Sequence, residues 1–221
     1  MSDENGKPGL STWLAETRAS YDVDAAGYAE RVQGLLDTHP QLRAHLDVLA
    51  DLVKHGGGGP VADVGCGPGY ATRHLHDSGV EAFGIDLSPA MVAIAQRDHP
   101  RVRFEVGSMT GLDVDTCSLA AVVAFWSIIH VPDEAMPSVM AEFHRVVRPG
   151  GLVLIGFHVG DGIEHASTGY TGEPISVDTH LRQASTVSDW LRDAGFRLES
   201  VTVLRPDDDV PGAIVLARRQ G

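Results

Sequence analysis

The stretch from Val61 to Tyr70, which reads Val-Ala-Asp-Val-Gly-Cys-Gly-Pro-Gly-Tyr, constrains the fold more than any other part of the chain. A short apolar run enters a loop in which Gly65, Gly67 and Gly69 occupy every second position, and an amphipathic segment follows. This order predicts a strand, a sharp turn and the start of a helix. Because glycine has no Cβ, the loop backbone can approach a ligand closely and adopt positive φ. The helix N-terminus behind the loop presents unpaired N–H groups, which favours an anionic or electron-rich ligand group.

From this loop onwards, apolar runs alternate with helical patterns. Strands are expected at 61–65, 81–86, 101–106, 119–126 and 152–157, and helices at 70–78, 89–97, 133–147 and 187–194. Such alternation is typical of a parallel sheet with helices on both faces. The last two strands, 196–204 and 213–217, are joined by a short link without a helix, so they should pair antiparallel. The sequence therefore predicts a doubly wound α/β fold with a mainly parallel seven-stranded sheet and an antiparallel strand at one edge.

The chain before the glycine loop is predicted to be helical. We expect residues 1–9 to form a disordered tail and residues 10–58 a helical lid, which ends at four consecutive glycines. Residues 59–221 are expected to form the α/β domain, and the whole chain a single unit. Within this domain, residues 158–186 are rich in Gly, Thr, His and Asp and show little periodicity. That composition predicts an irregular insert, and such long inserts in compact domains are usually functional or mobile.

Charge and composition narrow the class of protein. The chain has 30 Asp and Glu against 17 Lys and Arg, which gives a formal net charge of −13, and no run of Lys or Arg exceeds two residues. Nucleic-acid-binding proteins usually carry a basic patch, so we expect neither a nucleic acid nor an anionic membrane surface as partner. No apolar run is long enough to span a bilayer, and the first residues lack the pattern of a signal peptide. With only two cysteines, the chain suits a reducing cytoplasm.

Five places in the sequence should converge on one cleft, because open parallel sheets bind ligands at the carboxyl ends of their strands. These places are the glycine loop, Asp86, Ser108 with Met109, the segment 125–130, and Phe157 with His158. Asp86 follows the glycine loop by about twenty residues, at the end of the second predicted strand. A carboxylate at this position can accept hydrogen bonds from both hydroxyls of a ribose.

Three motifs in this order resemble those of a known family. The run from Asp63 to Gly69 is similar to the first motif of the class I S-adenosylmethionine-dependent methyltransferases, and the run from Gly84 to Met91, Gly-Ile-Asp-Leu-Ser-Pro-Ala-Met, to the second. The run from Phe143 to Gly151 resembles the stretch that leads into the fifth strand of that family. The resemblance covers roughly residues 21–157. It implies a Rossmann-like methyltransferase fold with S-adenosylmethionine as cofactor, S-adenosylhomocysteine as product, and methyl transfer to an oxygen, nitrogen or other nucleophile of a small molecule.

The resemblance also implies which residues hold the cofactor. Asp63 and the backbone of Gly65 and Gly67 would hold its methionine part, and Asp86 would bind its ribose. The other expected contacts are Leu87, Met91, Ser108 and Met109 around the adenine, Phe125, Trp126 and Ser127 over the methionine, and Tyr21 and Tyr28 from a covering N-terminal segment.

Methyl transfer to a hydroxyl, phenol or ammonium group is assisted by a base that removes a proton from the acceptor. His130, just beyond the fourth predicted strand, is the first candidate, although it could instead only pack beside the cofactor and orient it. His158, at the start of the insert, is the second candidate. The polar residues that follow His158 match no compact zinc pattern, so we expect no metal.

Two other functions compete with this interpretation. A nicotinamide-dependent oxidoreductase would carry the pattern GxGxxG, but its third glycine would fall at Tyr70. The second alternative is a protein that binds S-adenosylmethionine in a regulatory or non-methylating role, because the sequence contains no indispensable catalytic residue. In the leading interpretation, the protein is a cytoplasmic monomer or homodimer whose partner is a small-molecule methyl acceptor.

Overall fold

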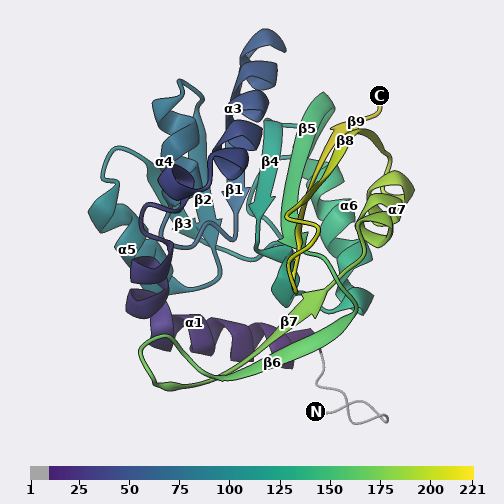
Figure 1. Cartoon of the computed structure of the whole chain (residues 1–221). Coiled ribbons are helices and arrows are strands. Elements are labelled where there is room, and N and C mark those ends of the chain that lie inside the picture. Colours follow the sequence, from purple (N-terminus) through teal and green to yellow (C-terminus); the bar gives the residue numbers. More distant parts are fainter. Residues whose placement is uncertain (1–9) are drawn as a thin grey trace.

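The structure is a computed structural model that describes residues 10–221, so the tail expected at 1–9 lies outside the described residues. A seven-stranded sheet with the strand order β3-β2-β1-β4-β5-β9-β8 forms the centre of the molecule (Figure 1). Its strands are β1 (Val61–Val64), β2 (Ala82–Asp86), β3 (Arg103–Val106), β4 (Leu119–Phe125), β5 (Val147–His158), β8 (Phe196–Leu204) and β9 (Gly212–Arg219).

The strand directions confirm the expected fold class. Strands β1 to β5 pair parallel with their neighbours. Strand β9 runs antiparallel to both β5 and β8. The antiparallel strand therefore lies one place inside the sheet, and β8 forms the edge. Strand order reverses between β1 and β4, and the carboxyl ends of these two strands are where a doubly wound sheet binds its ligand.

Helices cover both faces of the sheet because each has an apolar side. On one face, α3 (Pro40–His55) and α4 (Tyr70–Asp77) bury residues such as Leu46, Leu49 and Leu75. On the other face, α6 (Met136–Val146) and α7 (Ala184–Asp193) bury Phe143 and Leu191. The helix α5 (Pro89–Asp98) packs beside β2 and β3 (Figure 1). Two short 3-10 helices, η1 (Ile128–His130) and η2 (Asp133–Ala135), connect β4 to α6.

The N-terminal part is helical up to β1. It forms one long helix, α1 (Leu10–Val32), followed by the short helix α2 (Leu35–Thr38). Figure 1 shows α1 lying across the carboxyl ends of the parallel strands. Gly27 interrupts the apolar pattern of α1, and a Cβ at this position would lie 2.8 Å from the side chain of Thr171. The glycine therefore allows a close approach between α1 and the segment 158–186.

Residues 158–186 do not form the irregular insert that we expected. They contain a β-hairpin of β6 (Gly162–Thr168) and β7 (Pro174–Leu181), whose strands pair antiparallel. Figure 1 shows the hairpin running alongside α1. Most hairpin side chains are exposed or only partly buried, so the strands lack the alternating apolar pattern by which half-buried strands are recognised. The hairpin and α1 together are called the lid below.

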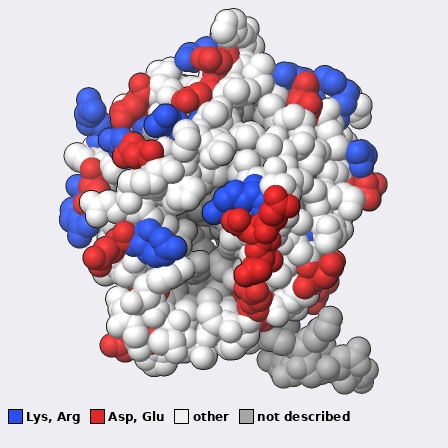
Figure 2. All heavy atoms as spheres, viewed as in Figure 1, with Lys and Arg blue, Asp and Glu red and all other residues white. Residues whose placement is uncertain are grey.

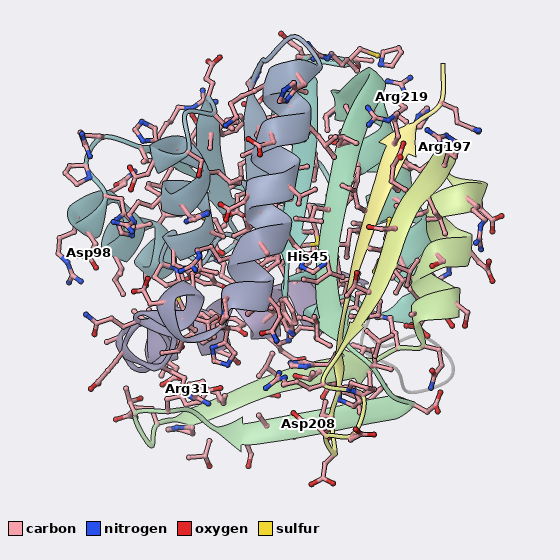
Figure 3. The ribbon with its side chains drawn as sticks, turned by 45° about the horizontal axis from the view of Figure 1, so that its top comes forward. Arg31, His45, Asp98, Arg197, Asp208 and Arg219 are labelled. Atoms are coloured by element: carbon pink, nitrogen blue, oxygen red, sulfur yellow. The ribbon has the colours of Figure 1, made fainter. Side chains whose placement is uncertain are left out.

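Charged side chains are dispersed over the surface. In Figure 2 the Lys and Arg atoms form small separate groups next to Asp and Glu, without a continuous basic patch on that face. Arg197 and Arg219 lie at the end of the sheet opposite to the hairpin, whereas Asp208 lies near the hairpin end (Figure 3). Among the described helices, none is both long and apolar enough to cross a membrane.

Candidate functional site

A pocket lies between the carboxyl ends of the parallel strands and α1, and we call it the inner pocket. The empty space within it, including a part that is open to solvent, is about 640 Å³. Its lining residues come from the lid, the glycine loop and the ends of β2, β3 and β4: Trp13, Leu14, Thr17, Tyr21, Tyr28, Gly65, Gly67, Asp86, Leu87, Met91, Gly107, Ser108, Met109, Trp126, Ser127, His130 and Val131.

Most of the residues selected from the sequence line this pocket, and three do not. Asp63 and Phe125 line a small cavity behind the glycine loop, together with Tyr28, Gly65 and Gly67. His158 lies outside both cavities, although its side chain contacts Trp126, which lines the inner pocket.

Five lining residues were not predicted from the sequence. Three of them, Trp13, Leu14 and Thr17, belong to α1, and the other two are Gly107 and Val131. Trp13, Thr17 and Tyr21 follow one another at intervals of four, so they occupy one side of the helix. Continuing the tyrosine pattern backwards along the helix would have found Trp13 and Thr17. Gly107 and Val131 carried no comparable signal, because they line the pocket only through the course of their loops.

The glycine loop is in close contact with the end of β4. Gly65 has φ of 75°, and a Cβ at this position would lie 2.2 Å from Cβ of Ser127. The Ser127 hydroxyl in turn donates to the carbonyl of Val64 (2.7 Å) and holds the two segments together. An alanine at Gly65 would thus be excluded by both backbone conformation and space. The tight turn exposes the loop backbone to the inner pocket.

Asp86 is held rigidly at the end of β2. Its Oδ2 accepts from the backbone N–H of Gly67 (2.7 Å), and its Oδ1 accepts from the backbone N–H of Ser88 (2.9 Å). The Ser88 hydroxyl caps α5 by accepting from the N–H of Met91 (3.1 Å). Burial raises the pKa of Asp86 to about 6, although the backbone N–H groups oppose this shift. Asp86 thus joins the glycine loop to the start of α5.

Asp63 is a buried carboxyl group with one oxygen unused. Its Oδ2 accepts from the hydroxyl of Thr72 (2.6 Å), but its Oδ1 has no hydrogen-bond partner among residues 10–221. Burial raises the pKa of Asp63 to about 7, while the hydrogen bond from Thr72 opposes the shift. A buried acceptor without a partner costs free energy, so this oxygen is a place where a ligand that donates a hydrogen bond would be favourable.

Tyr21 and His130 form a hydrogen-bonded pair in the wall of the inner pocket. The Nδ1 atom of His130 lies 2.8 Å from the carbonyl oxygen of Asp178. Because a carbonyl can only accept, Nδ1 carries the proton, and Nε2 accepts from the Tyr21 hydroxyl at 2.6 Å. Burial lowers the pKa of His130 to about 4, so its imidazole is neutral at pH 7. Burial also raises the pKa of the Tyr21 hydroxyl well above its ordinary value.

Polar side chains of α1 connect this helix to the hairpin and to the rest of the domain. The carboxylate of Asp24 accepts from the N–H groups of Tyr170 (2.8 Å) and Thr171 (2.9 Å) in the hairpin turn, and from the Thr171 hydroxyl (2.9 Å). Asp22 accepts from the Ser88 hydroxyl (2.6 Å) and thereby connects α1 to the start of α5. The lid is therefore anchored at two sides of the inner pocket.

Trp126 adopts an unusual backbone conformation beside the pocket. Its φ is 56°, which is rare for a bulky residue. A Cβ at Gly156 would lie 2.6 Å from its ring, so this glycine makes room for the indole over β5. The indole Nε1 donates to Nδ1 of His158 at 3.4 Å. His158 thus contacts a lining residue without lining the pocket itself.

Cys66 and potential metal ligands are the remaining groups with chemical reactivity. Burial raises the pKa of the Cys66 thiol well above its ordinary value, which makes it a poor nucleophile. In the part of the chain that the structure describes, no group of three or more His, Cys, Asp or Glu side chains is arranged to hold a metal ion.

Comparison with known proteins connects this architecture to a family. Residues 61–151 match the family model described as a methyltransferase domain. A probable S-adenosylmethionine-dependent methyltransferase of Mycolicibacterium smegmatis is 29% identical over 171 residues, which cover 76% of this chain and 63% of that protein. A malonyl-[acyl-carrier protein] O-methyltransferase of Serratia marcescens is 24% identical over 213 residues, which cover 92% of this chain and 73% of that protein. The chain therefore spans less than two thirds of the first of these relatives.

A solved structure supports the fold over nearly the whole chain. The 1,6-didemethyltoxoflavin-N1-methyltransferase of Burkholderia thailandensis, crystallised with 1,6-didemethyltoxoflavin and S-adenosylhomocysteine, matches with a TM-score of 0.72. It is 21% identical, and the match covers 97% of this chain and 92% of that chain. The similarity includes the lid as well as the sheet, since so little of the chain lies outside the match.

Proposed function

This chain belongs to the class I S-adenosylmethionine-dependent methyltransferases, and we propose that it transfers a methyl group from S-adenosylmethionine to a small-molecule acceptor. The observation that carries the proposal is Asp86, a buried carboxylate at the end of β2 that is aligned with the glycine loop. Each of its oxygens accepts one backbone N–H. Because a carboxylate oxygen has two lone pairs, each oxygen keeps one for a ribose hydroxyl.

The residues around the inner pocket fit this cofactor on two further grounds. Oδ1 of Asp63, buried and without a partner among residues 10–221, could accept a hydrogen bond from the amino group of the methionine part. The turn at Gly65 leaves room that a Cβ would fill, so the backbone can lie against the ligand. Asp63 and Asp86 also carry raised pKa values because burial disfavours their charge. A cationic ligand relieves that cost, and the cofactor carries both a sulfonium and an ammonium group.

The chain's own residues then have distinct tasks. When bound, S-adenosylmethionine supplies an electrophilic methyl group. Leu87, Met91 and Met109 offer apolar surface for the adenine. Ser108 has a hydroxyl 2.8 Å from that of Thr110 and adds a polar group at the same edge. The lid excludes water and aligns the acceptor, and alignment alone can contribute several kcal/mol to a transfer reaction.

The pair of Tyr21 and His130 is proposed as the proton-accepting group. His130 is neutral at pH 7, and the lone pair of its Nε2 atom accepts the hydrogen bond from the Tyr21 hydroxyl. An acceptor that donates a hydrogen bond to Tyr21 can pass its proton to the tyrosine oxygen as the tyrosine proton moves to Nε2 of His130. His158 remains a second candidate, and it acts in this scheme only through its contact with Trp126.

The proposal also covers the domain organisation, the partners and the cellular setting. We propose that residues 10–58 act together with the hairpin as a lid over the domain of residues 59–221, in one unit. The net charge of −13 supports an acceptor other than nucleic acid or a membrane surface. A cytoplasmic monomer or homodimer is consistent with two unpaired cysteines.

Calorimetric titration with S-adenosylmethionine and S-adenosylhomocysteine tests the cofactor, with NADH as the competing ligand. We expect both sulfur compounds to bind with micromolar affinity and NADH not to bind. Absence of binding of either sulfur compound at high micromolar concentration would refute the proposal. Incubation with S-adenosylmethionine labelled in its methyl group then separates a methyltransferase from a protein that binds the cofactor without methyl transfer, because only the former labels an acceptor.

A further inference from the structure

A second cavity lies next to the inner pocket, and we call it the outer chamber. It is bounded by α1 from Trp13 to Thr17, by the segment 130–134 and by hairpin residues between 163 and 180. Trp13, Thr17 and His130 line both the inner pocket and the outer chamber. These three side chains therefore form the boundary between the two spaces. A molecule in the outer chamber would face the inner pocket across this boundary.

Trp13 lies at the boundary, and its side chain carries an unused hydrogen-bond donor. The residue is 9% exposed, and its indole Nε1 is buried without a hydrogen-bond partner among residues 10–221. An unpaired buried N–H is costly, and tryptophan side chains usually find a partner when buried. A ligand atom that accepts a hydrogen bond, such as a carbonyl, ether or ring nitrogen, would satisfy it.

The charge of the outer chamber selects against anions. Three carboxylates line it, those of Glu16, Glu134 and Asp178, whereas none of its described lining residues is Lys or Arg. Asp178 is paired with Nδ1 of His165 at 2.7 Å. An anionic ligand would lose hydration here without gaining a Lys or Arg partner among the described lining residues.

The nearby guanidinium of Arg182 does not change this conclusion. It is buried behind the segment 128–133, where it pairs with the carboxylate of Asp133 at 2.9 Å. It also donates to the carbonyl of Ile128 at 2.9 Å and to that of Val131. Its donors are therefore directed to the protein, and Arg182 does not line the outer chamber.

We propose that the outer chamber binds the methyl acceptor and that this acceptor is a small molecule with a basic nitrogen, together with a hydrogen-bond acceptor that faces Nε1 of Trp13. The inference rests on the proposed function, and it specifies the substrate class. The positive charge of such a molecule lies among Glu16, Glu134 and Asp178, and its reactive atom meets the boundary at Trp13, Thr17 and His130. Carboxylic acids and phosphate esters are excluded from the same space by charge.

Binding of three probes of similar size and different charge tests the proposal on protein saturated with S-adenosylhomocysteine. The probes are benzylamine, benzyl alcohol and benzoate, measured by ligand-observed NMR. We expect benzylamine to bind about tenfold more tightly than benzoate, since attraction to one partly exposed carboxylate supplies a factor of this size. Equal or tighter binding of benzoate would overturn the proposal, and so would a failure of all three probes to bind.

Charge variants make the test specific to the outer chamber. The double variant Glu16→Gln, Glu134→Gln should weaken benzylamine binding at least fivefold and leave benzyl alcohol binding unchanged. Glu81→Gln, an exposed residue outside both cavities, is the matched control and should change neither. Unchanged benzylamine affinity in the double variant would contradict the proposal.

The substitution Trp13→Phe, which keeps an aromatic ring but removes the N–H, tests the second half of the proposal. It should weaken binding of 2-amino-1-phenylethanone, an aliphatic amine whose carbonyl can accept a hydrogen bond, more than binding of 2-phenylethylamine. Equal weakening of both would overturn the role of Nε1. Loss of S-adenosylhomocysteine binding by the unmodified protein would instead refute the proposed function, so the two failures can be told apart.

Discussion

The hydroxyl of Tyr21 lies 2.6 Å from Nε2 of His130, although the two residues are 109 positions apart in the chain. The contact joins α1 to the end of β4, and the Nδ1 contact with Asp178 extends it to the hairpin. One neutral imidazole thus connects α1, the segment after β4 and the hairpin. In the proposed scheme the Tyr21 hydroxyl occupies Nε2 of His130, so the proton of the acceptor passes through the tyrosine oxygen.

We predict that Tyr21→Phe and His130→Ala both reduce the turnover number, by about 10²-fold or more for the loss of a general base. Cofactor affinity should fall much less, because both substitutions leave the carboxylates of Asp63 and Asp86 in place. Steady-state kinetics combined with calorimetry separates the two effects. Equal losses of turnover and cofactor affinity would favour a purely structural role for the pair.

The pH profile of turnover gives a second test of the same pair. The pKa of His130 is lowered by burial to about 4, so the imidazole stays unprotonated at all pH values well above that. Turnover should therefore show no loss between pH 7 and pH 5.5 that is attributable to His130. An acid limb near pH 6.5 that disappears in His130→Gln would show that the imidazole titrates as in water and would contradict the buried, neutral state.

Asp86→Ala should weaken cofactor binding by about 1.5–3 kcal/mol, the range for hydrogen bonds to a charged group. Glu105→Ala is a suitable control, because Glu105 is an exposed carboxylate on the neighbouring strand β3. The dissociation constant of S-adenosylhomocysteine is the measurement. An unchanged constant in Asp86→Ala would count against the ribose assignment.

Cofactor affinity should depend on pH with a sign set by Asp86 and Asp63. Burial raises the pKa values of these groups to about 6 and about 7, and the ionised forms bind the cofactor. As pH falls through this window the ligand-free protein takes up protons, so the affinity should weaken, approaching tenfold per pH unit for each obligatory proton. Calorimetry between pH 5 and pH 8 would show it. Affinity that is flat or rises towards acid pH would contradict the prediction.

Two glycine substitutions separate backbone strain from loss of space in the glycine loop. Gly65 and Gly79 both have positive φ, but a Cβ at Gly79 meets nothing within 4 Å, whereas one at Gly65 lies 2.2 Å from Ser127. Gly79→Ala should cost about 1–2 kcal/mol of unfolding free energy from conformation alone. Gly65→Ala should cost a further 1–3 kcal/mol or so from overpacking and abolish cofactor binding. Equal unfolding free energies in chemical denaturation would show that Ser127 moves without cost.

Asp24→Ala should release the hairpin from α1. The substitution removes three hydrogen bonds that the buried carboxylate accepts from Tyr170 and Thr171, so two backbone N–H groups of the hairpin turn lose their protein partner. Hydrogen exchange at the hairpin should accelerate, while exchange in β4 and β5 should stay the same. Asp37→Ala, an exposed residue of α2, is the control. Unaltered hairpin exchange in Asp24→Ala would show that other contacts hold the lid.

The parts that the sequence could predict are those with a local physical signal. The alternation of apolar runs and amphipathic segments was sufficient to predict strands β1 to β5 along the chain. The short link after Leu204 was sufficient to predict the antiparallel pairing of β8 and β9. The glycine loop and Asp86 were found because close backbone approach and a strand-end carboxylate each leave a mark in a few adjacent residues. Their convergence follows from the topology of parallel sheets.

The parts that could not be predicted depend on contacts between distant residues. The hairpin was not predicted because it is held by hydrogen bonds to Asp24 and Ser20 of α1 rather than by a buried apolar face. Trp13 and Thr17 became lining residues only because α1 crosses the ends of the strands. His158 was selected for its place at the end of β5, but its side chain contacts Trp126. The positive φ of Trp126 cannot be predicted from the sequence pattern.

A crystal structure with S-adenosylhomocysteine bound is the most direct test of the central claim, that the inner pocket is the cofactor site of a methyltransferase. We expect the ribose hydroxyls to lie within hydrogen-bond distance of the Asp86 carboxylate, the amino group near Oδ1 of Asp63, and the sulfur facing Trp13, Thr17 and His130. A ligand bound elsewhere, or one in this pocket whose sulfur faces away from that boundary, would contradict it.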